Sequence, residues 1–422
     1  MKNIITYITK LLTKLTNFGQ SAEISRNRDI EPSSNRDMKC PYCLSQNFVK
    51  RGLRQKKREK VQMYLCKDCQ KVFTRQITKG KHYPLPAVLQ GLSLYNLGYS
   101  LEQVCQILKQ RDNYDIQPTS ISNWVKEFEP LCRFGRLREY ALKKYAPKDM
   151  VVSATLAHRQ LYRYLFHRAK CDLIISDDFK HRRFGPLQEF LAMVPGECPH
   201  QYFQDGLRAS EAPLTFSKTQ MIVRAKQNYA NKLCEFVLQS VKENKQRHHA
   251  LQKFMLANDS VTVATEVPVY ITKDDIEHMQ TQLGFEMYTK SAETGSATAV
   301  CKIGTGTPKL ITGHIDILQI RNGQIHILDY KPNAGKERPI EQLTLYAMAL
   351  SRLTGLRLFE FKCAWFDEND YFEFFPLHVL HKPTRGRRRR KVYTMEGVYE
   401  INKEKKKISS LRPINKTNYV IH

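Results

Sequence analysis

The chain lacks any long hydrophobic run. None of its apolar stretches approaches the roughly 18–20 residues that a membrane-spanning helix needs, so we expect no membrane-spanning segment. It also shows no secretory signal. Its 11 cysteines are therefore expected to stay reduced in the cytoplasm, where thiols bind metal ions or lie in hydrophobic cores.

Acidic residues are scarce relative to basic ones. The sequence has 41 Asp and Glu against 68 Lys and Arg, which gives a formal net charge of +27. Such an excess predicts a polyanionic partner, with nucleic acid as the first choice and an anionic membrane surface as the second. The 422 residues are enough for two or three domains.

Residues 1–18 carry an apolar stripe at helical spacing, with lysines off the stripe. A basic amphipathic helix of this kind can touch a membrane surface, although packing on the protein itself or on another copy is the simpler interpretation. Residues 19–38 are polar and aperiodic, and we expect them to form a linker.

Two CxxC pairs follow, Cys40 with Cys43 and Cys66 with Cys69, with 22 residues between them. Two such turns are typical of a tetrahedral structural Zn²⁺ site, so we predict zinc here rather than disulfides. The order of the two pairs resembles the zinc ribbon at the N-terminus of many bacterial and archaeal transposases. In such a ribbon, Phe73 would pack under the metal site.

The stretch between the two cysteine pairs is densely basic. Such a run is usually a solvated face, but beside other DNA-binding signals we expect it to contact phosphates. The residues expected to do so are Lys50, Arg51, Arg54, Lys56, Lys57 and Arg58.

Three helices are expected in residues 82–132. The first spans Leu85–Leu97 and ends before Gly98. A capping-box signature from Ser100 to Gln103 opens the second, and Pro118 starts the third. The spacing resembles the helix-turn-helix that follows such ribbons in transposases. The third helix would then be the recognition helix, with Ser120, Ser122 and Asn123 near base edges. An ordinary small helical bundle is the alternative.

Residues 133–215 form a basic, aromatic connecting region without a recognised family. Interleaved aromatic and basic residues suit a nucleic-acid strand and amphipathic helix surfaces equally well. Asp177 and Asp178 follow a strand-like run, Cys171–Ser176, and are interpreted as a turn. Cys198-Pro199-His200 lacks a second pair of ligands, so we expect no metal site there.

The C-terminal half contains two acidic residues that interrupt apolar, β-rich runs, Asp316 and Asp329. Asn322-Gly323 lies between them and is a strong hairpin signal. The hairpin would bring the two acids to neighbouring strands, with Lys331 two residues further on. Carboxylates in an apolar strand need a partner. Two of them beside an ammonium group can hold a divalent cation and stabilise charge on a phosphate. The strands are expected at residues 310–320 and 324–330.

Further polar residues accompany this hairpin. Glu266 lies in a strand expected over residues 261–270, and residues 339–350 are expected to form a helix with Pro339 in its first turn. Gln342 and Tyr346 are four residues apart and share one face of that helix. A capping box at Ser217–Gln220 predicts an earlier long helix that runs to about Lys245.

Residues 218–380 resemble the PD-(D/E)xK nuclease superfamily, especially its RecB-like branch. The matching motifs are GxxD at Gly313–Asp316, DxK at Asp329–Lys331 and QxxxY at Gln342–Tyr346. The resemblance implies that Asp316, Asp329 and the Tyr330 carbonyl bind Mg²⁺ or Mn²⁺ and that Lys331 orients the attacking water. Glu266 would be an accessory ligand, while Gln342 and Tyr346 would position the substrate strand. A half-buried sheet with chance acids is the alternative.

The sequence departs from the RecB-like pattern at the preceding helix. Asn231 stands where a Gly is expected, and Cys234 or Glu235 falls near an expected His. His248 and His249 are in a polar run and are expected to be solvated. Cys363 has no CxxC partner nearby, so we expect no iron–sulfur cluster.

We therefore predict a multidomain α+β protein, with a zinc ribbon and a helical helix-turn-helix head before a restriction-endonuclease-like mixed sheet flanked by helices. The expected function is metal-dependent hydrolysis of DNA in a mobile-element or genome-defence setting. RNA stays open as a substrate, no membrane partner is expected, and cutting both strands of a duplex would favour a homodimer. The expected parts are residues 1–38, 39–78, 82–132, 133–215, 216–380 and a basic tail, 381–422, that binds phosphates nonspecifically.

Two alternatives to this function follow from the same residues. One is a noncatalytic DNA-binding regulator whose nuclease-like domain is degenerate. The other is a transposase-derived enzyme that carries out DDE-type recombination.

Overall fold

The computed structural model describes residues 39–55, 60–74, 83–132, 135–218, 221–241, 243–289, 307–380 and 399–400. These residues belong to two compact units. One contains the four cysteines of the CxxC pairs, and the other contains all described residues from Tyr83 onward. The N-terminal helix and linker (1–38), three predicted phosphate contacts (Lys56, Lys57 and Arg58) and nearly all of the basic tail lie outside the described residues.

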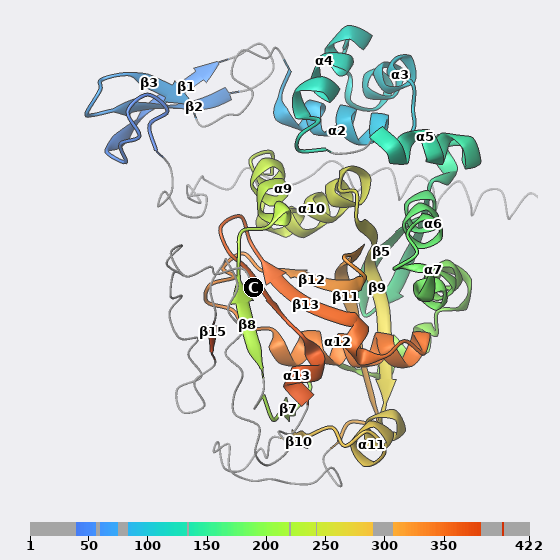
Figure 1. Ribbon diagram of the computed structural model, residues 1–422. Helices are drawn as coiled ribbons and strands as arrows, with labels where there is room; N and C mark the ends of the chain where they lie inside the picture. Colours follow the sequence, from blue (N-terminus) through green and yellow to red (C-terminus); the bar gives the residue numbers. More distant parts are fainter. Residues whose placement is uncertain are drawn as a thin grey trace, which may run out of the picture. The chain divides into compact units, whose positions relative to one another are not determined.

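The cysteine unit is built on a three-stranded sheet in the order β1-β2-β3 (Figure 1). Phe73 is buried against Cys40 and Cys66, as the ribbon pattern predicts, and Phe48 and Tyr64 pack around it. The strands are β1 (Phe48–Gln55), β2 (Lys60–Cys66) and β3 (Val72–Thr74).

A helical head opens the second unit, and its helices begin where the sequence predicts. The capping box before the second helix is present: Ser100 Oγ accepts a hydrogen bond from Gln103 N at 3.2 Å, and Gln103 Oε1 accepts one from Ser100 N at 2.9 Å. Trp124 is buried. The helices are α2 (Leu85–Asn96), α3 (Leu101–Asp112), α4 (Pro118–Phe128) and α5 (Gly135–Lys144).

The main sheet has ten strands and is mixed. Its path is β15-β8-β14-β13-β12-β11-β9-β5-β4, and β6 pairs with β11 off this path. The β12–β13 and β6–β11 pairs are parallel, and the other pairs are antiparallel. The strands are β4 (Val151–His158), β5 (Gln160–His167), β6 (Leu207–Arg208), β8 (Ile222–Ala225), β9 (Thr262–Thr272), β11 (Leu310–Arg321), β12 (Gln324–Tyr330), β13 (Phe361–Phe366), β14 (Tyr371–Phe374) and β15 (Tyr399–Glu400).

Helices cover both faces of this sheet. On β12, Ile325 and Ile327 join one core cluster with α6, α7 and α12, whereas Leu328 and Tyr330 join a second cluster with α9, α10 and the head. Burial on both faces explains why β12 is an almost continuous apolar run. The remaining helices are α6 (Arg168–Asp177), α7 (Gly185–Glu197), α8 (His200–Asp205), α9 (Tyr229–Leu238), α10 (Asn244–Asn258), α11 (Lys273–Thr281), α12 (Ile340–Thr354) and α13 (Pro376–Leu380).

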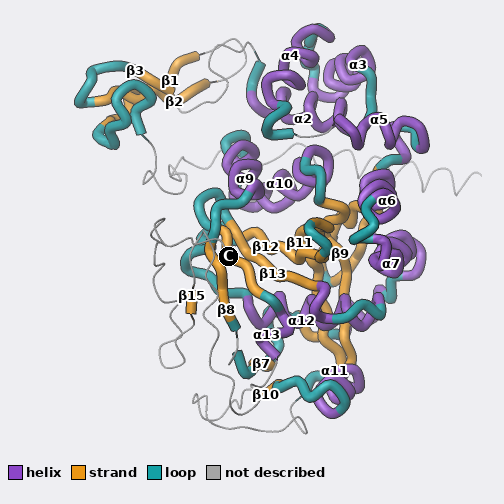
Figure 2. Tube along the Cα trace, viewed as in Figure 1, coloured by secondary structure: helices purple, strands orange, loops and turns teal. Residues whose placement is uncertain are grey.

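In Figures 1 and 2, α9 and α10 lie between the head helices and the sheet. Three short 3₁₀ turns complete this unit, together with a two-stranded sheet of β7 (Leu214–Phe216) and β10 (Met287–Thr289). No helix in the described ranges is both long and apolar enough to cross a membrane. The 3₁₀ turns are Pro147–Asp149, Arg182–Phe184 and Leu358–Glu360.

The long helix predicted from Ser217 to Lys245 is wrong. That stretch contains β8, α9 and only the start of α10. Lys218 has φ of 53°, a left-handed conformation that does not begin a helix, and β8 pairs with β14. The helix cap lies further on, at Asn228, whose side chain accepts a hydrogen bond from Ala230 N at 3.1 Å.

One expectation for the middle of the chain also differs from the structure. The strand-like run Cys171–Ser176 lies in α6, where Cys171 and Ile175, four residues apart, enter the core. A short apolar run does not by itself distinguish a buried helix from a strand. The aromatic and basic stretch 162–167, for which two interpretations were open, lies in β5, and Tyr164 and Phe166 are buried.

Candidate active site

Asp316 and Asp329 occupy facing positions on a β-hairpin. The β11–β12 pairing ends at Ile317 opposite Leu328, so the next residues in register are the two acids. The turn residues Asn322 and Gly323 have φ of 53° and 70°, which are the left-handed values of a type I′ turn. The hairpin predicted from Asn-Gly is confirmed.

Lys331 and Tyr330 complete this group. Lys331 Nζ lies 3.0 Å from Asp329 Oδ2, and the backbone N–H of Tyr330 donates to Asp316 Oδ2 at 3.3 Å. Asp316 therefore contacts the last residue of β12, and Asp329 contacts the residue that follows this strand. Metal binding by the Tyr330 carbonyl stays a prediction.

The two acids titrate differently. Burial and the charge of Asp316 raise the pKa of Asp329 well above its ordinary value. Burial also opposes ionisation of Asp316, but the hydrogen bond and charge of His248 lower its pKa below the ordinary value. Asp316 is therefore the more readily ionised member of the pair.

A third acid, Glu266 on β9, lies level with Asp316. Its neighbours Thr265 and Val267 pair with Ile317 and Ile315. Its φ of 51° is left-handed, a conformation that costs a non-glycine residue of order 1 kcal/mol and that clusters at functional sites. Burial and the charge of Asp316 raise the pKa of Glu266 to about 8.

Helix α10 supplies two side chains that the sequence interpretation missed. His248 Nδ1 lies 3.2 Å from Asp316 Oδ2, so His248, whose side chain is 40% exposed, is both solvated and paired with an acid. Gln252, one turn further along α10, donates to Glu266 Oε1 at 2.7 Å. A histidine and a glutamine four residues apart share one helix face, and this spacing was the available signal.

The RecB-like pattern places its histidine on the preceding helix, near Cys234 or Glu235 and after Asn231. These residues lie on α9, whereas His248 lies on α10. Asn231 is buried, and its side-chain amide donates to the carbonyls of Asp367 and Asp370 at 2.7 and 2.9 Å. Cys234 is buried in the core, and Glu235 is exposed on α9. Asn231 therefore ties α9 to the turn between β13 and β14.

The GxxD and QxxxY motifs contact each other. A Cβ atom on Gly313 would lie 2.2 Å from Tyr346 Cε1, so the Tyr346 ring occupies the space that only a glycine leaves open. Gln342 Nε2 donates to Tyr346 Oη at 2.8 Å and fixes the phenol. This contact holds α12 against β11 beside Asp316.

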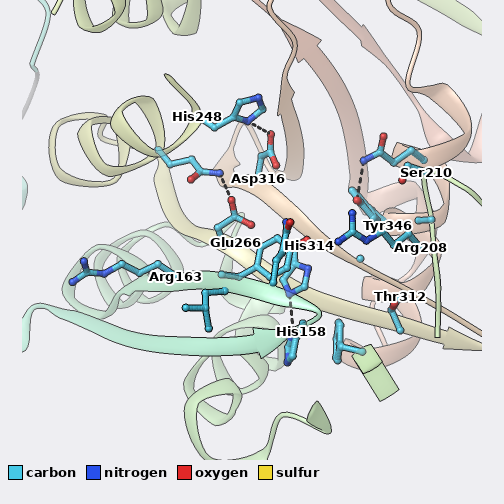
Figure 3. A pocket seen from close by; sticks show the side chains of 18 of the residues that line it. His158, Arg163, Arg208, Ser210, His248, Glu266, Thr312, His314, Asp316 and Tyr346 are labelled. Carbon is cyan, nitrogen blue, oxygen red and sulfur yellow. Dashed lines mark hydrogen bonds and ion pairs between the residues drawn. The ribbon is translucent and has the colours of Figure 1, made fainter. Parts of the chain in front are cut away.

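A cavity of about 530 Å³ opens onto this group (Figure 3). Asp316, Glu266 and His248 line it, together with Gln342 and Tyr346. Asp329 and Lys331 are not part of the lining. Basic side chains also line the cavity, namely Arg163, Arg208, Lys245 and His249.

The donor set suits a divalent cation. Three carboxyl groups lie close together, and burial together with the charge of Asp316 raises the pKa of both Asp329 and Glu266. Oxygen ligands with one imidazole fit Mg²⁺ or, better, Mn²⁺. The side chains that would hold such an ion are Asp316, Asp329, Glu266 and His248.

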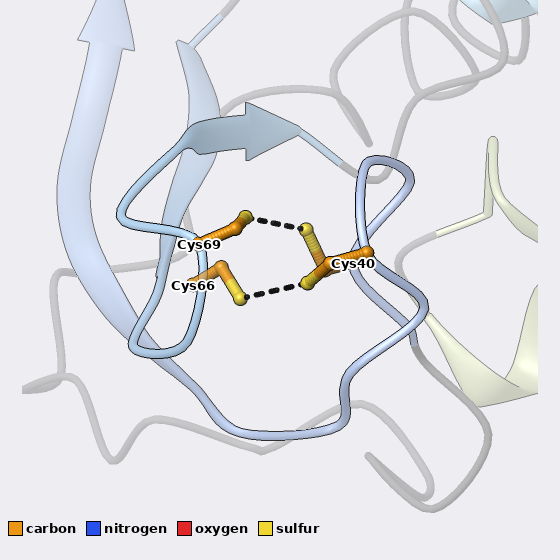
Figure 4. A group of neighbouring side chains, drawn as sticks. Cys40, Cys66 and Cys69 are labelled. Carbon is orange, nitrogen blue, oxygen red and sulfur yellow. Dashed lines mark hydrogen bonds between the residues drawn. The ribbon is translucent and has the colours of Figure 1, made fainter.

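The four cysteines also converge (Figure 4). Cys40 Sγ lies 3.6 Å from Cys69 Sγ, and Cys43 Sγ lies 3.5 Å from Cys66 Sγ. These distances are far longer than the ~2.05 Å of a disulfide. They are close to the ~3.8 Å between thiolates bonded to one tetrahedral Zn²⁺. The cluster can therefore hold a zinc ion.

The predicted DNA contacts in the described residues are accessible to different degrees. Lys50, Arg51 and Arg54 are exposed on β1. On α4, Asn123 is exposed, while Ser120 and Ser122 are half-buried. None of these side chains lines the cavity.

Cys198 and His200 have one further candidate ligand nearby, although not a second pair. His158, at the end of β4, brings its Nε2 atom to 2.9 Å from His200 Nδ1 and 3.8 Å from Cys198 Sγ. Burial and the neighbouring His200 lower the pKa of His158 to about 4, so its ring is neutral at pH 7.

A mixed sheet with helices on both faces, and with acids from adjacent strands beside a lysine, defines a restriction-endonuclease-like domain. The family model of the PD-(D/E)XK nuclease superfamily matches residues 188–400, just over half of the chain, and the protein belongs to this superfamily. The search of curated proteins and the search of solved structures each gave no match.

Proposed function

We propose that this protein is a metal-dependent deoxyribonuclease of the RecB-like branch. The observation that carries the proposal is the meeting of Asp316, Asp329 and Lys331 on one hairpin, with His248 and Glu266 beside them at a cavity. A bound cation would favour ionisation of Asp329 and Glu266, whose pKa values are raised, and a nuclease of this class uses such an ion.

Each side chain has a task in phosphodiester hydrolysis. A bound Mg²⁺ or Mn²⁺ would supply a nucleophilic water and stabilise charge at the phosphate. Asp316 and Asp329 hold the ion, and His248 keeps Asp316 ionised. Lys331 orients the attacking water and offsets charge on the scissile phosphate. Gln342 and Tyr346 position the strand that is cut.

The basic cavity lining supports a nucleic-acid substrate. Arg163 and Lys245 are exposed and Arg208 is half-buried, so all three can reach phosphates that flank the scissile bond. Phosphate contacts provide most of the affinity and position the strand without reading its sequence.

The N-terminal parts would grip the DNA. We propose a zinc ribbon at Cys40, Cys43, Cys66 and Cys69, which presents Lys50, Arg51 and Arg54 to phosphates. We also propose that α4 reads bases through Asn123, with Ser120 and Ser122 beside it. This pairing of a transposase-like head with a nuclease domain supports a mobile-element or genome-defence role.

The test incubates purified full-length protein with end-labelled single- and double-stranded DNA and with RNA, in Mg²⁺, in Mn²⁺ and in EDTA. We expect metal-dependent cleavage of DNA that falls at least ~100-fold in Asp329→Asn and in Lys331→Ala. The matched control is Asp178→Asn, because Asp178 is exposed at the end of α6.

Other outcomes would contradict the proposal. DNA binding without cleavage in any metal would identify a DNA-binding regulator. Strand transfer lost in Asp178→Asn but kept in Asp329→Asn would identify a DDE-type recombinase.

A further inference from the structure

A second group of nitrogen and sulfur ligands lies at the edge of the same unit, outside the acidic group. His158 ends β4, Cys198 follows the last residue of α7, and His200 begins α8. Their ligand atoms, His158 Nε2, Cys198 Sγ and His200 Nδ1, all lie within 4.8 Å of one another. Three segments therefore bring one donor each to a common point.

The spacing is within about half an ångström of that around a tetrahedral ion. Zn–N bonds of about 2.0–2.1 Å and Zn–S bonds of about 2.3 Å place ligand atoms roughly 3.3–3.6 Å apart. His158 Nε2 lies 2.9 Å from His200 Nδ1 and 3.8 Å from Cys198 Sγ, on either side of this range. Cys-Pro-His is a short, stiff connection, because proline fixes its own φ between the two ligands.

The surroundings hold the donors in place. The His158 ring stacks on Phe203 with centroids 4.0 Å apart. Gln204 Nε2 donates to Ala157 O at 2.7 Å, which ties α8 to the end of β4. A Cβ atom on Gly206, directly after α8, would lie 2.5 Å from Thr312 Cγ2, so α8 is also pressed against β11.

His158 has the second interaction that a metal-bound imidazole usually makes. Its Nδ1 atom lies 2.8 Å from His314 Nε2. With Nε2 turned to an ion, His158 donates its Nδ1–H to His314, and this bond fixes the tautomer. His314 lies on β11, two residues before Asp316, and its ring stacks on Tyr162 with centroids 3.6 Å apart.

We propose that His158, Cys198 and His200 bind a zinc ion. Mixed imidazole and thiolate donors select a borderline-soft divalent ion rather than Mg²⁺ or Ca²⁺. Three protein ligands leave the fourth position for water. The ion joins β4 to the α7–α8 connection and, through His314, braces the wall of the cavity. A chain of hydrogen-bonded neutral histidines without an ion is the competing arrangement.

The first test counts zinc in the purified full-length protein by elemental analysis. Cys198→Ser and, separately, His200→Ala should each lower the zinc content by one equivalent per chain. His200 is exposed, so His200→Ala is the variant that is expected to fold without difficulty. Cys105→Ser is the matched control, because Cys105 is a half-buried thiol on α3 outside both clusters.

The ribbon cysteines must be separated from this site. In Cys43→Ser, any zinc held by the four-cysteine cluster is weakened, while the equivalent that depends on Cys198 should remain. After replacement with Co²⁺, the difference spectrum between Cys43→Ser and the double variant Cys43→Ser with Cys198→Ser should be that of an ion with one thiolate ligand. Equal zinc content in wild type, Cys198→Ser and His200→Ala would overturn the proposal and leave the histidine chain.

Discussion

Among single residues, His248 gives the most direct test of the acidic group. It contacts Asp316 from a helix that is distant in sequence. We expect His248→Ala to raise the pKa of Asp316 and to lower Mn²⁺ affinity by about 10- to 100-fold, the range seen when a metal ligand loses its partner. Isothermal titration with Mn²⁺ measures this directly.

The control for this variant is His278→Ala, on the exposed last turn of α11. Its Mn²⁺ affinity should equal that of the wild type. An unchanged affinity in His248→Ala would show that His248 neither holds the ion nor supports Asp316.

Lys170 gives a prediction about stability and pH. Its side chain is buried in α6 and donates to the carbonyls of Leu256 and Asp259, both at 2.5 Å. Burial lowers its pKa from 10.5 to about 7. Between these two values the unfolded chain binds a proton that the folded chain lacks, so this group makes the protein more stable as the pH rises from about 7 to 10.5.

The measurement compares the free energy of unfolding of wild type and Lys170→Met by urea denaturation at several pH values in this window. The difference between wild type and variant should grow in favour of wild type by up to about 1.4 kcal/mol per pH unit. A difference that does not vary with pH would mean that Lys170 keeps its charge in the folded state.

Residues close together in sequence were the ones that could be predicted. Asp316, Asp329 and Lys331 were found because one Asn-Gly turn sets their register. His248 and His158 were missed because their partners, Asp316 and His314, are brought to them only by the packing of the sheet and helices. Local patterns carry no information about such contacts.

At the scale of elements, the contact between β11 and α12 leaves no room for a larger residue at Gly313. A methyl group on Gly313 overlaps the Tyr346 ring, so Gly313→Ala should destabilise the protein by about 1–3 kcal/mol and displace Tyr346 from Gln342. Cleavage should fall as well, since the ring lines the cavity next to Asp316.

A double-mutant cycle tests this cause. Tyr346→Ala removes the ring, so Gly313→Ala should lower the free energy of unfolding much less in that background. The coupling between the two changes should be about 0.5–3 kcal/mol, as is typical of residues in contact. Additive effects on the free energy of unfolding would mean that Gly313 is needed for another reason.

Elements whose boundaries depend on local signals were predicted well. β11, β12 and α12 begin and end within a few residues of their expected positions, because turn, proline and apolar patterns mark them. The helix expected from Ser217 fails because β8 forms by pairing with β14, far along the chain. The local preference of a capping-box sequence for a helix is weaker than the pairing of β8 with a strand that is distant in sequence.

On the scale of the whole molecule, the helical head is joined to the nuclease fold by a shared core and by a buried polar contact. Asn96 of α2 donates to Asn258 Oδ1 of α10 at 2.7 Å, and Asn258 Nδ2 donates to Ser93 Oγ at 2.9 Å. Helix α10 also carries His248 and Gln252. The head therefore packs directly on the helix whose side chains contact Asp316 and Glu266.

We expect the head and α10 to open as one cooperative unit. Asn258→Ala leaves the buried amide of Asn96 without its acceptor, at a cost of about 1–3 kcal/mol. Hydrogen exchange should then accelerate in α2 and in α10 by the same factor, which is about 5- to 150-fold for that free energy. Asn369→Ala is the control, since Asn369 lies in the turn between β13 and β14 and outside this contact. Faster exchange confined to α10 would show that the head is an independent module, and DNA bound by α4 would then have no direct route to the acids.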